Sequence, residues 1–493
     1  MSITERLGKE LNTDQIIDDD EILTEYASDH SFVPAKKPRL VVKPKSAMEV
    51  QKIVNIANRL KFPLIPVSSG PPRFRGDTVP SADGVVMVDL REMNRVIWVS
   101  RRDRVCVIEP GVTFGQLEDE LESHRLRSMM PLCPKSTKSV IASHWERNPI
   151  TCPRFHWDEQ DPLASTEFIV GNGDSMWTGD AGLVGGLQPM SPAKQREKGM
   201  AHKVPFGILN MNVQKIGGGS QGTLGICTWA SVRCELFPEH EELFVVYDDN
   251  IQNLIEPATK LIHYRLADDL FILNSVNLAA LLKREADDIR ALRDTLPPWI
   301  LVYTLVGYGT MPEKMFEYKE IVLKDKQIPA MDSLPSSSIK EVQALIRQPS
   351  DDPYWKLRLK GESRDLIFLT SLAKSPGFIK TVQKIATKAK FPNSDIGIYI
   401  QPIRQGCYSH MEFDINMSAE DQAEAKVVQK LIKEAANQMF STGAFFNQPY
   451  GKLSDLIYPH YPDTVKVLKI VKKIFDPKSV MSPGKLCFSE VVE

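Results

Sequence analysis

The segment from Pro38 to Gly70 constrains the fold more than any other part of this 493-residue chain. Leu40–Val42 is a short β-prone run, and Ser46 follows it as a helix N-cap with Glu49 three residues later, which predicts a capping box. Apolar residues then recur at the helical period until a proline ends the pattern. Leu64–Val67 is a second β-prone run that leads into a turn. This order predicts a β-α-β unit, and therefore a domain that mixes helices with a sheet.

Further strand signals follow at 84–90 and 105–109, and Thr113 caps the next predicted helix. A hairpin is predicted over 166–178 because Asn172-Gly173 is a strong hairpin turn signal. Beyond Pro238 the pattern changes to helices packed on an antiparallel sheet. The helices are expected at 251–261, 278–292, 377–389 and 419–440, and the strands at 301–306, 396–400 and 410–415. A last helix is expected at 463–474.

Composition excludes several classes of protein. The 61 Lys and Arg against 63 Asp and Glu give a net charge of −2, which supplies no overall field for a nucleic acid. The seven cysteines form no CxxC pair, so iron–sulfur and structural zinc sites are not expected. The first fifteen residues lack the apolar stretch of a signal peptide, and no apolar run has the length of a membrane span. These features predict a cytoplasmic protein with reduced thiols.

Six segments, taken in order, resemble a known family. They are 39–70, 85–96, 105–121, 166–179, 220–236 and 474–486, and they are similar to the FAD-binding fold of the vanillyl-alcohol oxidase/p-cresol methylhydroxylase superfamily, which includes glycolate and D-lactate dehydrogenase flavoproteins. The resemblance implies an α+β fold in which a two-subdomain FAD-binding domain carries an antiparallel-sheet-and-helix cap. The FAD domain is expected over 1–238, the cap over 239–450, and a C-terminal return to the FAD domain over 451–493.

The resemblance also implies which residues contact FAD. Pro71 and Pro72 interrupt the usually glycine-rich phosphate loop and donate no N–H, so Arg73 and Arg75 are expected to replace those donors. No segment matches the histidine or tyrosine attachment motifs of the family, which predicts non-covalent FAD. The expected cofactor contacts are Ser68, Ser69, Gly70, Pro71, Arg73, Phe74, Arg75, Gly76, Asp77, Pro110, Gly111, Val112, Thr113, Lys138, Ser139, Ser143, Gly222, Thr223, Gly225, Ile226 and Lys485.

The predicted strand over 401–415 is the candidate catalytic element. Strand alternation places Tyr408, His410, Glu412 and Asp414 on one face, which is either a catalytic face or the solvent face of a half-exposed strand. We expect His410 to be the general base and Glu412 to orient it. Tyr408 would stand beside them, and Arg404 would bind a substrate carboxylate.

Two residues of a later segment, Asn447 and Tyr450, are the candidates for the substrate pocket. Glycolate- and lactate-type relatives carry a two-histidine metal motif. This chain has His410 alone at that place, so no metal is predicted.

These features favour an FAD-linked dehydrogenase that passes a hydride from a hydroxylated organic substrate to flavin N5, with 2-hydroxy acids among the candidates. The resemblance implies an external electron acceptor, either an iron–sulfur subunit or an electron-transfer flavoprotein, and is compatible with a homo-oligomer. Two alternatives stay open. One is a phenol-type oxidase or hydroxylase that uses Tyr408, Tyr450 and Arg404. The other is a non-catalytic subunit with a degenerate flavin site, which the proline-containing loop suggests.

Overall fold

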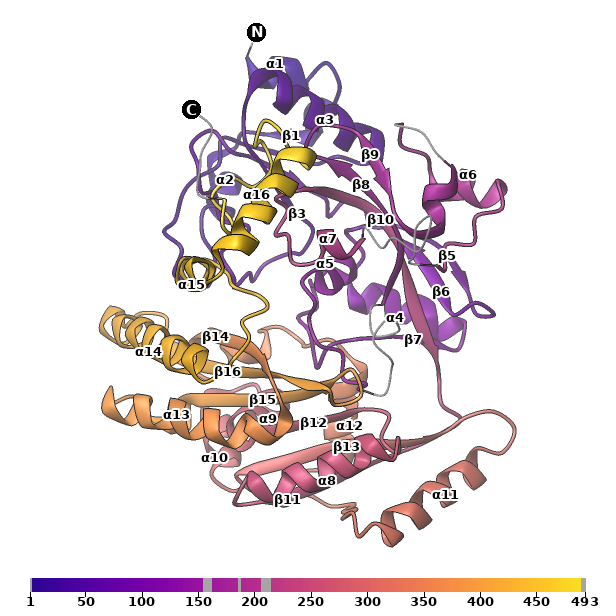
Figure 1. Ribbon diagram of the computed structural model, residues 1–493, viewed down its shortest axis with the longest axis vertical. Helices are drawn as coiled ribbons and strands as arrows, with labels where there is room; N and C mark the ends of the chain where they lie inside the picture. The colour runs from indigo at the N-terminus through magenta and orange to yellow at the C-terminus, as the bar shows by residue number, and fades with distance from the viewer. Residues whose placement is uncertain (1, 154–161, 185–187, 205–213, 489–493) are drawn as a thin grey trace.

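A computed structural model describes residues 2–153, 162–184, 188–204 and 214–488. It shows two bodies stacked end to end (Figure 1). The first body holds the N-terminal half and the C-terminal helices, and the second, which we call the cap, holds the strands and helices between 240 and 441. None of the described helices combines the length and the apolar composition that crossing a membrane requires.

The first sheet contains the predicted β-α-β unit. Its strand order is β1 (Ile16–Ile17), β2 (Leu40–Val42), β4 (Val86–Asp89) and β3 (Leu64–Val67), with β2 and β3 parallel to β4. The crossover helix is α3 (Ala47–Leu60), and the Ser46 side chain accepts from the Glu49 N–H as predicted. The capping box is only half formed, because the Glu49 carboxylate accepts from the N–H of Lys45 instead of Ser46.

The second sheet stands beside the first and confirms the predicted hairpin. Its strand order is β5 (Val96–Ser100), β6 (Val105–Ile108), β10 (Gly225–Leu236), β8 (Leu163–Val170) and β9 (Ser175–Trp177), and β7 (Leu126–Ser128) also pairs with β10. Helices α4 (Phe114–Ser123) and α5 (Val140–Trp145) pack against this sheet through buried apolar side chains.

The cap is a six-stranded antiparallel sheet with helices on both faces. Its strand order is β11 (His240–Asp248), β13 (Trp299–Gly307), β12 (Leu270–Asn274), β15 (Ile396–Ile403), β16 (Tyr408–Ser418) and β14 (Gly361–Thr370). One face packs on α8 (Gln252–His263), α11 (Pro312–Asp325), α13 (Ser375–Lys388) and α14 (Gln422–Ser441). The other packs on α9 (Ser275–Leu282), α10 (Ala286–Arg293) and α12 (Ile339–Arg347). The single helix predicted over 278–292 is wrong, because Lys283 is extended and separates α9 from α10.

The predicted alternation along β16 is confirmed. Met411, Phe413 and Ile415 lie in the apolar core beneath α13 and α14. His410 and Asp414 are buried on the opposite face, where Asn277 of α9 donates to Asp414. The solvent-face interpretation of this strand is therefore wrong, and β16 presents buried polar groups at the cap end nearest the first body.

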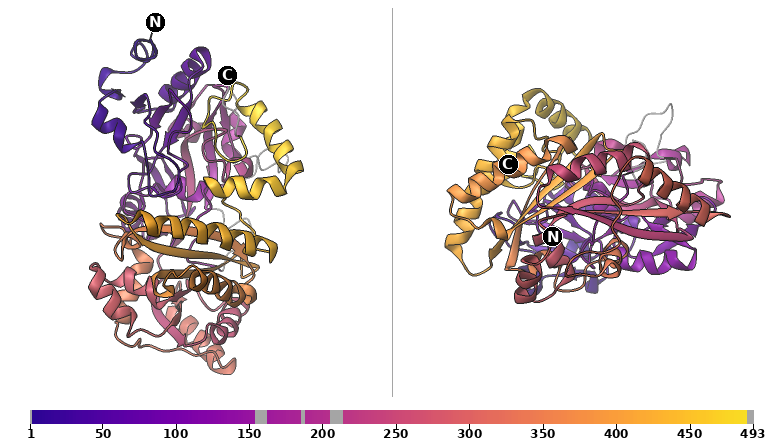
Figure 2. Two further views of the ribbon diagram at one scale, coloured as in Figure 1. Left: turned by 90° about the vertical axis from the view of Figure 1, so that its left-hand side faces the viewer. Right: turned by 90° about the horizontal axis from the view of Figure 1, so that it is seen from below.

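The chain then returns to the first body through α15 (Lys452–Ile457) and α16 (Pro462–Phe475), which the left view of Figure 2 shows beside the N-terminal sheets. The buried Lys472 ammonium of α16 donates to the carbonyls of Thr223 and Met481 and pairs with Asp476. Asp476 also accepts from the backbone N–H groups that follow it. This network fastens the C-terminal segment to the start of β10.

Candidate active site

A cavity of about 270 Å³ lies where the cap meets the first body. It begins between the two sheets of the first body, beside Pro66 and Ile226, and reaches the polar face of β16. A ligand that lay along it would touch segments more than 300 residues apart in sequence.

The loop after β3 forms one wall of the cavity and offers unused hydrogen-bond donors. Its backbone N–H groups at positions 73, 74, 75, 77 and 78 donate to no other described residue. The hydroxyl of Thr78 is buried and has no partner within the described part of the chain. The loop is nevertheless held in place, because the buried Lys135 ammonium donates to the carbonyls of Gly70 and Pro72.

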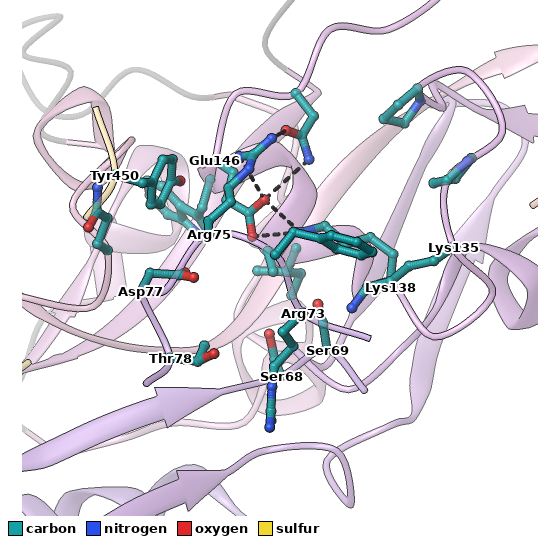
Figure 3. A pocket seen from close by; sticks show the side chains of 18 of the residues that line it. Ser68, Ser69, Arg73, Arg75, Asp77, Thr78, Lys135, Lys138, Glu146 and Tyr450 are labelled. Atoms are coloured by element: carbon teal, nitrogen blue, oxygen red, sulfur yellow. Dashed lines mark hydrogen bonds and ion pairs between the residues drawn. The ribbon is translucent and has the colours of Figure 1, made fainter. Parts of the chain in front are cut away.

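Arg75, Glu146 and Lys138 form a buried charge network on the same wall (Figure 3). Lys138 Nζ lies 2.6 Å from both carboxylate oxygens of Glu146, and Arg75 NH1 lies 3.3 Å from one of them. Burial opposes ionisation of Glu146, but Lys138 and Arg75 outweigh it and hold its pKa below the usual range. Arg75 also donates to Gln448 and Asn148, and its guanidinium lies 5.0 Å from the centre of the Tyr450 ring. Arg75 is therefore engaged by protein partners, not held free for a phosphate.

Glycines form another part of the lining and let the backbone approach a ligand closely. Gly217, Gly219, Gly222 and Gly225 all line the cavity. Gly222 has a positive φ of 70°, and a Cβ there would lie 2.6 Å from Pro66 Cγ. A side chain at this position would therefore collide with the first sheet.

The donors on these walls fit FAD. The loop after β3 lines the cavity with backbone N–H groups that donate to no described residue, and such N–H donors are what a pyrophosphate requires. Lys135 and Lys138 stand on the same wall, where they are engaged by the loop carbonyls and by Glu146. The glycine wall provides the flat, close surface that suits a ring system. These residues would hold the cofactor between the two sheets of the first body, with the cap beyond it.

The cap wall carries a histidine–carboxylate pair. His410 Nε2 lies 3.0 Å from one oxygen of Glu412, and both residues line the cavity. Asp365 of β14 stands directly opposite Asp414 of β16 in the strand register. The aromatic side chains of this wall are Tyr354, Trp355 and Tyr399.

Lys356 is the counterion of this wall. It follows Trp355 in the 3-10 turn at Trp355–Leu357, and its ammonium lies 3.0 Å from Asp365, 2.7 Å from Asp414 and in direct contact with the other oxygen of Glu412. Burial opposes ionisation of Glu412, but Lys356 and His410 hold its pKa well below the usual range. Burial and the charge of Glu412 raise the pKa of Asp414 well above its usual range despite Lys356. The lysine thus favours ionisation of Glu412, whereas burial and the neighbouring carboxylate oppose ionisation of Asp414.

The oxygens of Asp365, Glu412 and Asp414 lie within 4.8 Å of one another, a grouping that could hold a metal ion. Lys356 already contacts all three carboxylates, which gives the group an internal cation. The expectation that the chain uses no metal stays a prediction.

The structure brings many of the predicted site residues into the cavity. Its lining includes Ser68, Ser69, Arg73, Phe74, Arg75, Asp77, Pro110, Lys138, Gly222, Gly225, Ile226, His410, Glu412 and Tyr450. Outside the lining lie Gly70, Pro71, Gly76, Gly111, Val112, Thr113, Ser139, Ser143, Thr223 and Lys485. Some of these support the wall: Lys485 donates to the carbonyls of Gly76 and Val79, and Ser139 donates to that of Pro110.

Three predicted substrate-side residues lie outside the cavity lining: Arg404, Tyr408 and Asn447. Arg404 is in the turn between β15 and β16, where its φ is +48°, and its guanidinium lies 5.8 Å from the centre of the Tyr408 ring. Asn447 is half-buried, outside the cavity lining. Sequence reasoning missed Lys356, Asp365 and Glu146, which come from a short turn, an ordinary strand and a helix end. None of them belongs to a periodic or motif signal in the sequence.

His144, one turn into α5 behind the cavity, gives a pH-dependent stability. Burial, with a smaller effect of Lys138, lowers its pKa to about 3, and its ring packs edge-on against Phe114. The unfolded chain binds a proton at this histidine below about pH 6.5 whereas the folded chain does not. The free energy of unfolding is therefore unaffected by this group above about pH 6.5, and it decreases as the pH drops from there toward 3.

We expect His144→Leu to remove this dependence. The free energy of unfolding of the wild type, measured in urea, should fall relative to the variant by about 1.4 kcal/mol for each pH unit below pH 6.5. Parallel stability curves for the two proteins between pH 4 and 7, roughly the span of that titration, would show that His144 titrates normally in the folded state.

The comparisons with known proteins agree with this geometry. A family model described as an FAD binding domain matches residues 38–142, which include the β-α-β unit and the loop of the cavity wall. The flavoprotein subunit of 4-cresol dehydrogenase (hydroxylating) from Pseudomonas putida is 28% identical over 152 residues, which is 31% of this chain and 29% of that protein. D-2-hydroxyglutarate dehydrogenase of Stutzerimonas stutzeri (strain A1501) is 24% identical over 490 residues, or 96% of both chains.

A solved structure extends the similarity to the whole fold. The 4-ethylphenol oxidase of Gulosibacter chungangensis matches with a TM-score of 0.82 at 19% identity, over 98% of this chain and 96% of that one. The two bodies and the cavity between them thus define an FAD-linked oxidoreductase. The chain shares the FAD binding domain and the fold of the FAD-binding flavoproteins of the p-cresol methylhydroxylase/vanillyl-alcohol oxidase type. This assignment does not support the alternative of a non-catalytic subunit.

Proposed function

We propose that this chain is an FAD-dependent dehydrogenase of a hydroxylated organic substrate, with His410 as the base. The observation that carries the proposal is the His410–Glu412 pair on the cap wall of the cavity whose other walls fit FAD. Oxidation of a carbinol needs a base for the hydroxyl proton while the hydride leaves. Bound FAD supplies the hydride acceptor. Ionised Glu412 holds the His410 ring by one nitrogen and stabilises the positive charge that the imidazole gains with the proton.

The charge of the cap wall favours one kind of substrate. Asp365, Glu412 and Asp414 face a single lysine there, and Arg404 lies outside the cavity lining. A carboxylate on the carbinol carbon would enter beside these acids at a cost in desolvation and repulsion. An alcohol without that carboxylate avoids the repulsion and pays only the smaller desolvation cost of a neutral group. We therefore propose a neutral alcohol ahead of a 2-hydroxy acid.

A matched pair of substrates tests this choice. We expect 1-phenylethane-1,2-diol to reduce the holoenzyme with a kcat/KM at least about ten-fold higher than mandelate, a difference of about 1.4 kcal/mol. The assay uses an artificial electron acceptor. Faster reduction by mandelate would support a hydroxy acid, the substrate class that the name of the Stutzerimonas stutzeri relative indicates.

A phenol is the second candidate substrate. The observation that favours it is the aromatic lining of the cavity, in which Tyr450 joins Tyr354, Trp355 and Tyr399, a wall that would suit the ring of a phenol. Reduction by 4-ethylphenol ahead of both carbinols would support it.

Two further features belong to the same proposal. FAD is bound without a covalent link, so acid precipitation should leave a colourless pellet and a yellow supernatant. Electrons pass to a partner protein, as the name of the Pseudomonas putida flavoprotein subunit suggests for that enzyme. Turnover with oxygen alone should then be slower than with the artificial acceptor.

A further inference from the structure

The three carboxylates of the cap wall share one counterion. Lys356 Nζ reaches one oxygen from each of Asp365, Glu412 and Asp414. The second oxygen of Glu412 is thereby left for His410, at 3.0 Å. The second oxygen of Asp414 accepts from Asn277 of α9 at 2.6 Å. Each carboxylate is thus oriented by its contact with the same ammonium.

Without a counterion this arrangement would be unfavourable. Asp365 and Asp414 stand directly opposite each other across the β14–β16 pair, where like charges repel. Asp414 and Glu412 are almost fully buried, so water screens them poorly. Lys356 is itself buried, and its contacts with the three acids hold its charge in place.

We propose that Lys356 is a positioning residue for the reaction, an internal cation that holds Glu412 as the partner of His410. This inference rests on the proposed function, and it identifies the residue that makes His410 available as a base. Lys356 acts through Glu412 and need not touch the substrate.

Loss of the Lys356 ammonium should shift the pKa of Glu412 in a known direction. Since Lys356 lowers the pKa of Glu412, its removal raises that pKa, and the His410–Glu412 pair takes up a proton at higher pH. An opposite charge in direct contact shifts such a titration by about one to three pH units. Among the described residues, the other titratable or charged groups that face the pair are Tyr399 from β15, Asp365 from β14, Asp414 from β16 and Tyr354 beside Lys356.

The experiment follows the protonation of His410 directly. The chain has nine histidines, and the imidazole signal of His410 in the NMR spectrum of the holoenzyme is identified by its absence in His410→Gln. Its midpoint is then measured from about pH 5 to 9 in the wild type, Lys356→Met and Lys356→Arg. The same variants are assayed for the pH dependence of alcohol-driven flavin reduction.

Lys360 provides a matched control. It also pairs with two carboxylates of the cap, Asp395 at 3.0 Å and Glu424, but it lies outside the cavity lining. Lys360→Met should therefore leave both readouts unchanged, and so should treatment of the wild type with EDTA. If Lys356→Met does not fold, the double variant Lys356→Met/Asp414→Asn is measured in its place. It removes the cation together with one of the three acids.

We expect Lys356→Met to raise the NMR midpoint by at least about one pH unit and to move the acid limb of the rate profile by a similar amount. Lys356→Arg should restore both. An unchanged midpoint in Lys356→Met, or an equal shift in Lys360→Met, would overturn the inference. Shifted midpoints in a protein that no alcohol reduces would instead count against the proposed function alone.

Discussion

Replacement of His410 by Gln slows alcohol-driven reduction of the bound flavin by roughly 10²- to 10⁴-fold, the range that loss of a general base produces. His410 is 2% exposed and lines the cavity, with Nε2 held by Glu412, and the amide of a glutamine at that position is too weak a base to take the hydroxyl proton. The measurement is single-turnover reduction in the absence of oxygen. FAD content should stay unchanged, because His410 belongs to the cap and the FAD-compatible walls belong to the first body.

His460 is the control for this variant. It stacks on Phe440 in the turn at Tyr458–His460, outside the cavity lining. His460→Gln should reduce its flavin at the wild-type rate. A His410→Gln protein that retains more than about a tenth of the wild-type rate would contradict the role of His410 as the base.

Gly225→Ala weakens FAD binding by roughly ten- to a hundred-fold. Gly225 lines the cavity at the start of β10, and a Cβ there would lie 2.5 Å from the carbonyl oxygen of Ile169 and 2.8 Å from Val170 Cα. Both atoms belong to the backbone of the paired strand β8, so β10 has to move and the cavity wall moves with it. Overpacking of this kind costs about 1–3 kcal/mol. If FAD binds only to the unshifted wall, about 1.4–2.7 kcal/mol of that strain returns on binding and gives the stated range in Kd.

The measurement is FAD binding to the apoprotein by calorimetry. Gly377 of α13 is the matched control, because a Cβ there meets no atom within 4 Å. Gly377→Ala should bind FAD as the wild type does. Equal affinities for wild type and Gly225→Ala would show that the cofactor does not depend on this wall.

The local elements of the site follow from the sequence because their signals are local. Ser46 caps α3, and the alternation along β16 places His410 and Glu412 opposite Met411 and Phe413 as predicted. The period of a strand fixes which side chains share a face, whatever the strand pairs with.

The rest of the site depends on contacts between distant segments. Asp365 faces Asp414 only through the register of β14 on β16, and Lys356 reaches both from a turn that no periodicity marks. Arg404 was expected in the pocket as a continuation of the strand. Its positive φ instead places it in the turn after β15, outside the cavity lining. A single sequence shows neither register nor the direction of a turn.

The most direct test of the account is the anaerobic addition of 1-phenylethane-1,2-diol to the purified, FAD-loaded wild-type protein. We predict that the visible absorption band of the oxidised flavin disappears and returns when the artificial acceptor is added. A flavin that stays oxidised with the diol, with mandelate and with 4-ethylphenol would contradict the proposed oxidation of a hydroxylated substrate at this cavity.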